Sequence, residues 1–187
     1  MNPAHAPLLT LEPLIEAVKE GVEAAGWTLS GMQKTTSYEY GGRWRGESSR
    51  SAYLFFHAVA LDESVSVDAF LDETSRGIQG NLALVIGGPE LVDPRPALAA
   101  LASAVRERIP RTYRAPVSLR LRLADAEHPP ESATVEARVR IMIPGGALRS
   151  GHAEVSRVSA EGVRAFEQLL AQRVARIQYP DRKSSNC

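Results

Sequence analysis

The chain has 187 residues, of which 44% are hydrophobic and 24% are charged. This length and composition supply a hydrophobic core and exclude disordered, collagen-like and coiled-coil proteins. The 22 basic and 22 acidic residues give a formal net charge of zero, which excludes a uniformly basic binder of nucleic acid or membranes.

The sequence has no pattern of secretion or membrane insertion. Residues 1–10 contain no Lys or Arg, unlike a signal peptide. Uncharged runs such as 51–61 and 80–89 are much shorter than the ~20 residues that a membrane-spanning helix needs. The single cysteine, Cys187, excludes an intrachain disulfide. We therefore expect a cytoplasmic protein that does not contact a membrane.

The first half of the chain predicts a helix, two strands, a second helix and a strand. Apolar residues recur at helical spacing over 11–25, after Thr10 as a candidate N-cap. Residues 27–40 and 51–61 are rich in β-branched and aromatic residues around a glycine-rich loop. Residues 67–78 have helical spacing, and the wholly apolar run 82–86 predicts a strand covered on both faces.

The second half predicts a helix, three strands and a final helix. The first helix is expected over 94–109, after Asp93 and Pro94. Residues 117–123 and 134–143 alternate as strands do. A third strand is expected near 148–157, then a helix capped by Ser159 that extends to about 177.

These elements predict an α+β protein with a mostly antiparallel sheet and about four helices. We expect one compact domain over residues 1–187, with a flexible tail at 179–187. The alternative stays open that it contains two loosely similar helix-strand-strand-helix halves, 11–90 and 93–178. Residues 1–100 hold 7 basic and 13 acidic residues, and residues 101–187 hold 15 and 9, so the two regions have net charges of −6 and +6.

Two basic clusters suggest where a partner would bind. If the two strands 117–123 and 134–143 are neighbours, alternation places Arg120, Arg122, Arg138 and Arg140 on a single sheet face beside only Glu136. The glycine-rich loop and its flanks interleave aromatic and basic residues, including Arg43, Trp44, Arg45 and Arg50. Such groups hold single-stranded nucleic acid and also anchor protein interfaces. In both clusters, pairing or packing within the protein is the structural alternative.

No catalytic or cofactor motif accompanies these clusters. The sequence lacks a Gly-x-Ser-x-Gly elbow, a His-Glu-x-x-His motif and a phosphate-binding loop. Its four histidines have no metal-ligand spacing. We therefore expect a binding protein without catalytic residues, cofactor or metal.

The predicted partner is anionic, with nucleic acid as the first candidate and an acidic protein segment as another. The alternative function is a protein-interaction or assembly module, such as a homodimer or a chaperone-like adaptor, that uses the same surface. An enzyme of unrecognised type is the third hypothesis.

Overall fold

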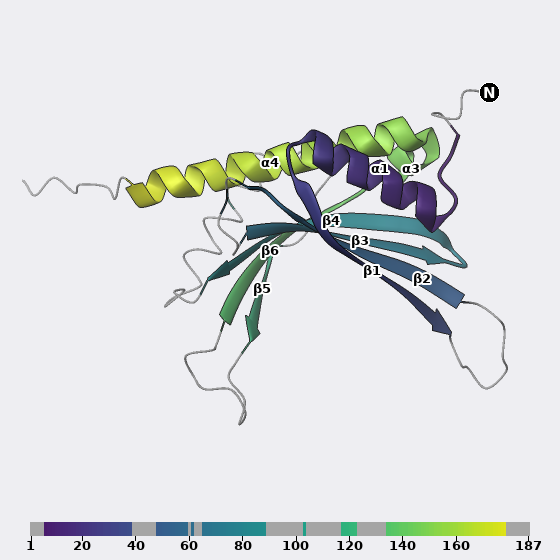
Figure 1. The fold of residues 1–187 in the computed structure, drawn as a ribbon, viewed down its shortest axis with the longest axis horizontal. Coiled ribbons are helices and arrows are strands. Elements are labelled where there is room, and N and C mark those ends of the chain that lie inside the picture. Colours follow the sequence, from purple (N-terminus) through teal and green to yellow (C-terminus); the bar gives the residue numbers. More distant parts are fainter. Residues whose placement is uncertain are drawn as a thin grey trace, which may run out of the picture.

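The computed structural model describes residues 6–38, 48–59, 61, 65–88, 103, 117–122 and 134–178. At residues 38, 48, 87–88, 117–122, 134–137 and 172–178 it describes the backbone alone. The described residues form one layer of helices on one face of an antiparallel sheet (Figure 1).

Six strands make up the sheet. They are β1 (Thr28–Tyr38), β2 (Ser48–His57), β3 (Val65–Thr74), β4 (Gly77–Gly88), β5 (Val117–Arg122) and β6 (Thr134–Met142). Their order across the sheet is β1, β2, β3, β4, β6, β5, and every neighbouring pair is antiparallel. Strands β1 to β4 therefore form a meander, and β6 pairs with β4 to join the later part of the chain to the same sheet.

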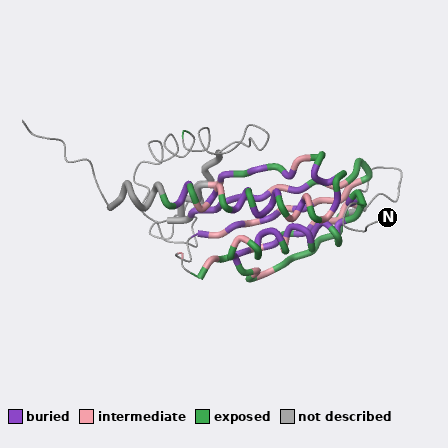
Figure 2. Tube along the Cα trace, turned by 90° about the horizontal axis from the view of Figure 1, so that it is seen from above, coloured by how far each residue is buried: buried purple, intermediate pink, exposed green. Residues whose placement is uncertain are grey.

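Three helices are described. Helix α1 (Leu11–Ala24) precedes the sheet, and α3 (Gly145–Ser150) and α4 (His152–Gln178) follow it. Helices α1 and α4 lie side by side over one sheet face (Figures 1 and 2). Their apolar side chains pack with alternate residues of the strands into a single core cluster, which includes Leu14, Val18, Leu54, Leu84 and Phe166. Burial of this apolar surface is the main stabilising contribution to the fold.

Glycines allow α4 to approach both α1 and the sheet closely. A Cβ on Gly21 of α1 would lie 2.2 Å from the backbone oxygen of Ser156. A Cβ on Gly162 of α4 would lie 2.3 Å from the Ile141 side chain. Both positions therefore require the absence of a side chain.

The beginning of α1 is held by a carboxylate from the sheet. Thr10 is the N-cap, but its side chain makes no capping hydrogen bond. Instead, the Leu11 backbone N–H donates to Oε2 of Glu73 on β3 at 2.6 Å. Arg50 of β2 donates to the same Glu73 oxygen at 2.6 Å and to Oε1 of Glu12 at 2.8 Å. This network joins the first turn of α1 to two strands, with negative charge at the positive end of the helix.

Several predicted elements are confirmed. The helix expected over 11–25 is α1, and Gly26, with a positive φ of 89°, follows its end. The strands expected at 27–40, 51–61, 117–123 and 134–143 correspond to β1, β2, β5 and β6. The run 82–86 lies within β4, and all five of its residues are buried. The α+β class and the largely antiparallel sheet are thus correct.

The predicted helix over 67–78 is wrong, because these residues form most of β3, a turn and the start of β4. Along β3, buried and half-buried residues alternate with a period of two. The turn at 75–76 ends β3, and Gly77 then adopts a φ of 113°, which favours glycine. Val67 and Leu71 satisfy both periods, so the sequence matched a helix by coincidence.

The predicted strand over 148–157 is also wrong. Residues 145–150 form α3, Gly151 separates the helices at a φ of 99°, and α4 begins at His152. Ser159 therefore lies inside α4, where its side chain is buried, and does not cap the helix. Val163, Phe166 and Leu170 of α4 are buried, at the spacing of an inward-facing helix stripe.

The predicted helix at 94–109 and the tail at 179–187 lie outside the described residues, apart from Ser103, which is helical. The described part of the chain thus contains three helices rather than about four. None of its helices combines the length and the apolar character needed to span a membrane.

Candidate binding surface on the open face of the sheet

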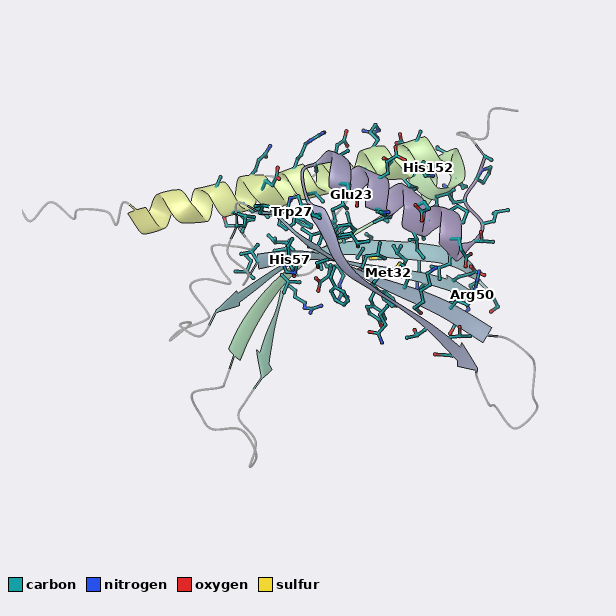
Figure 3. The ribbon with its side chains drawn as sticks, in the orientation of Figure 1. Glu23, Trp27, Met32, Arg50, His57 and His152 are labelled. Atoms are coloured by element: carbon teal, nitrogen blue, oxygen red, sulfur yellow. The ribbon has the colours of Figure 1, made fainter. Side chains whose placement is uncertain are left out.

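The sheet has a second face, opposite α1 and α4, which we call the open face. Its members follow from the strand registers, since residues directly opposite one another in an antiparallel pair point to the same side. Figure 3 shows His57 on this side of the sheet, away from the helices. The described side chains of the open face on the inner strands are Ser51, Tyr53, Phe55, His57, Ser66, Asp68, Phe70, Asp72, Gln79, Asn81, Ala83, Val85, Arg138, Arg140 and Met142.

One cross-strand row contains the large exposed apolar side chains of this face. Successive strand pairings align Gln33, Tyr53, Phe70, Asn81 and Met142, which we call the Tyr53 row. The ring centroids of Tyr53 and Phe70 are 4.8 Å apart, with an interplanar angle of 45°. Tyr53 is 40% exposed and Met142 is 41% exposed. An aromatic pair and a methionine, with amides between and beside them, thus form an amphipathic strip across the sheet.

Two carboxylates of β3 border the Tyr53 row. Asp68 accepts a hydrogen bond from Ser66 Oγ at 2.9 Å and lies 3.6 Å from Nη2 of Arg138. Asp72 accepts from Ser51 Oγ at 2.9 Å and from Gln79 Nε2 at 3.2 Å. Asp72 is therefore held by the two strands that flank β3, and Asp68 is held by its own strand and by β6.

The two predicted arginines of β6 have different surroundings. Arg138 is half-buried beside Asp68, so a carboxylate of the acidic region compensates its charge. Arg140 is exposed and forms no ion pair with the described residues. Its register partner Ala83 lies two residues from Asn81 on β4, a separation of about 7 Å along a strand. The Arg140 guanidinium is thus available next to the Tyr53 row.

The other predicted site residues are placed less fully. Arg120 is the register partner of Glu136, and Arg122 is the register partner of Thr134, so the expected pairing of β5 with β6 is confirmed. The side chains of both arginines lie outside the described ones. Arg43, Trp44 and Arg45 lie outside the described residues altogether.

Arg50 lies apart from the arginines of β6. It occupies the end of β2 nearest the start of α1 (Figure 3), and its register partner is Glu73. Hydrogen bonds to Glu73 and Glu12 raise the pKa of Arg50, and the Arg50 guanidinium binds both of these carboxylates. In this structure Arg50 joins α1 to the sheet.

Sequence reasoning did not assign the Tyr53 row. Tyr53 falls in the aromatic-rich region 27–56, but Phe70 was placed on a helix, and Met142 was not considered. The available signal was the alternation of Ser66, Asp68, Phe70 and Asp72 with buried Val67, Ala69 and Leu71. A strand assignment for 65–74 would have placed Phe70 next to Tyr53.

The described titratable groups do not assemble into a metal site. No group of three or more His, Cys, Asp or Glu among the described residues could hold a metal ion. His152, at the start of α4, lies 2.7 Å from Oε2 of Glu20 on α1. This contact lies between the two helices, away from the open face, and contributes to their packing.

Comparisons of the chain with protein-family models, with curated proteins and with solved structures find no match.

Proposed function

We propose that this chain is a binding protein that engages its partner through the open face of the sheet. The observation that carries the proposal is the Tyr53 row, in which Tyr53 and Met142 expose apolar surface between polar side chains. Aromatic residues, methionine and arginine are enriched where proteins bind partners. The row rests on a rigid sheet, so binding requires little ordering of its side chains.

The charges of the open face favour a protein segment as the partner. Its described charged side chains include two carboxylates, Asp68 and Asp72, and two guanidiniums, Arg138 and Arg140. These charges cancel, so this part of the face provides little long-range attraction for a polyanion. A segment with apolar side chains and one carboxylate would match it, with the carboxylate at Arg140 and the apolar groups on the Tyr53 row.

The test uses fluorescence anisotropy to measure the binding of a fluorescein-labelled peptide that contains phenylalanine, leucine and a single glutamate. We expect saturable binding that Tyr53→Ala weakens about tenfold, because truncation of a central aromatic anchor costs about 1–2 kcal/mol. The separate substitution Arg140→Glu should also weaken peptide binding, because it places a negative charge near the peptide carboxylate.

Two methionines provide a matched control. Met142 lies on the open face, whereas Met32 is 49% exposed on the helix side of the sheet, opposite buried Leu54. Met142→Ala should weaken peptide binding and Met32→Ala should not. Equal effects of the two substitutions, or no effect of Tyr53→Ala in a folded variant, would contradict the proposed surface.

Single-stranded nucleic acid is the second candidate partner. The observation that favours it is that the exposed Arg140 side chain lies on the same sheet face as the Tyr53 and Phe70 rings, since bases stack on rings and phosphates bind arginine. Labelled poly-uridine RNA in the same assay should then bind more tightly than the peptide. Its affinity should fall steeply with salt, because phosphate contacts release counterions. An RNA affinity that does not change with salt concentration, or that is unaffected by Tyr53→Ala, would exclude this candidate.

A further inference from the structure

Strand β1 forms a long free edge of the sheet. It is 11 residues long, pairs with β2 on one side, and stands first in the strand order. Residues 32–37 are all exposed, so the described part of the chain does not cover this edge (Figure 1). Such an edge presents a row of unpaired backbone N–H and C=O groups.

This edge lacks most of the features by which proteins prevent strand addition. Those features include proline, multiple charges, short length and bulges. The strand has no proline and a single charged residue, Lys34. Its one irregularity falls between Leu29 and Gly31, and the register from Gly31 to Tyr38 is unbroken. Thr35 and Thr36 are β-branched, which also favours a strand over a loop.

We propose that β1 of a second copy of this chain adds to this edge in antiparallel orientation, centred on Thr35. The two sheets would then form one continuous sheet about a two-fold axis, which is the commonest symmetry of homodimers. The open face of each copy stays exposed, so this dimer is independent of the partner proposed above.

The single charge of β1, its exposed methionine and the position of its bulge favour a second copy as the partner and a register centred on Thr35. The strand carries one charge in 11 residues, so two copies meet with little repulsion, provided that the two Lys34 residues are not opposite each other. A register centred on Thr35 places Lys34 opposite Thr36. It also places Met32, which is 49% exposed, opposite Tyr38. The paired segment, 32–38, is the part of the strand beyond the bulge.

The test is disulfide cross-linking in a Cys187→Ser background, which removes the native thiol. Opposite residues in an antiparallel pair have Cα atoms ~4.5–5.5 Å apart, which a disulfide can bridge. Thr35→Cys should therefore form a covalent dimer under mild oxidation. Thr36→Cys is the matched control, because its two copies would be diagonal neighbours at about 7–8 Å and should not cross-link.

Sedimentation velocity of the unmodified chain supplies the second measurement. We expect a dimer that dissociates on dilution, and Thr35→Lys should shift the boundary to the monomer, because it places like charges at the axis. Far-UV circular dichroism should show that the variant stays folded. The proposal is overturned by a wild-type chain that sediments as a monomer at every concentration, by a Thr35→Lys dimer, or by cross-linking at Thr36 instead of Thr35.

Discussion

Arg50 shows how a single residue changes meaning between sequence and structure. In the sequence it belongs to a basic and aromatic cluster, which suggested an anion-binding role. In the structure its guanidinium binds the protein's own carboxylates, Glu12 and Glu73. These contacts connect residues 38 and 23 positions apart in the chain, so no local pattern could reveal them.

The contact between Glu12 and Arg50 predicts a pH dependence of stability. The pKa of Glu12 lies below its ordinary value of 4.5, because its carboxylate accepts hydrogen bonds from its own backbone N–H and from the Arg50 guanidinium. A lowered pKa in the folded state stabilises the protein above pH 4.5, and this contribution is lost as the pH falls through the folded-state pKa. Because the pair is exposed, wild type should exceed Glu12→Gln by at most about 1 kcal/mol at pH 7.

Urea denaturation of wild type and Glu12→Gln between pH 7 and pH 3 checks this prediction. The difference in free energy of unfolding should narrow below pH 4.5. In an Arg50→Met background the same substitution should have a smaller effect at pH 7, as a double-mutant cycle requires of coupled residues. A difference that is constant across this pH range would contradict the role of the ion pair.

At the scale of elements, the sequence predicts long periodic segments well and their partners poorly. Helix α1 and strands β1, β2, β5 and β6 follow from composition and period. The segment 67–78 fits both a helix and a hairpin, and only its pairing with β2 and the remainder of β4 selects the strands. The strand predicted over 148–157 is wrong because the burial of these residues depends on contacts with other elements, which a local sequence pattern does not contain.

The contact between α1 and α4 predicts opposite effects for two Gly→Ala substitutions. Alanine favours a helix over glycine by about 1 kcal/mol. At Gly21 a new Cβ would collide with the Ser156 backbone oxygen, and overpacking of this kind costs about 1–3 kcal/mol. At Gly146 of α3 no atom lies within 4 Å of the new Cβ.

Gly21→Ala should therefore lower the urea midpoint, and Gly146→Ala should leave it unchanged or raise it slightly. Both substitutions replace a helical glycine by alanine, so the opposite direction of their effects reports the contact between α1 and α4. If Gly21→Ala raised the midpoint as much as Gly146→Ala, the close approach of α1 and α4 would be wrong.

At the scale of the whole molecule, an ion pair joins the acidic and basic regions of the sequence. The acidic first 100 residues contact the basic remainder at Asp68 and Arg138, whose charged groups are 3.6 Å apart. The charge of Arg138 is therefore compensated within the protein, whereas Arg140 is exposed and forms no ion pair with the described residues.

Trp27 reports on the assembly of these regions. It is buried at the junction of α1 and β1, and its Nε1 donates to Oε1 of Glu167 on α4 at 3.0 Å (Figure 3). In a Trp44→Phe variant, Trp27 is the remaining tryptophan. Its emission should shift to longer wavelength at the same urea concentration at which far-UV circular dichroism is lost, as in two-state unfolding. An earlier fluorescence transition would show that α4 separates before the sheet unfolds.

The place of β6 and α4 in the chain has a consequence for biosynthesis. Strand β4 pairs with a strand that begins almost 50 residues later, and α1 packs against a helix that begins more than 120 residues after it. As the chain leaves the ribosome, the apolar side of the β1 to β4 meander stays exposed and the edge of β4 stays unpaired until these later segments have been synthesised. Contacts between such distant residues form slowly, and exposed apolar surface and strand edges promote aggregation. The nascent chain is therefore most vulnerable while its last third is still being translated.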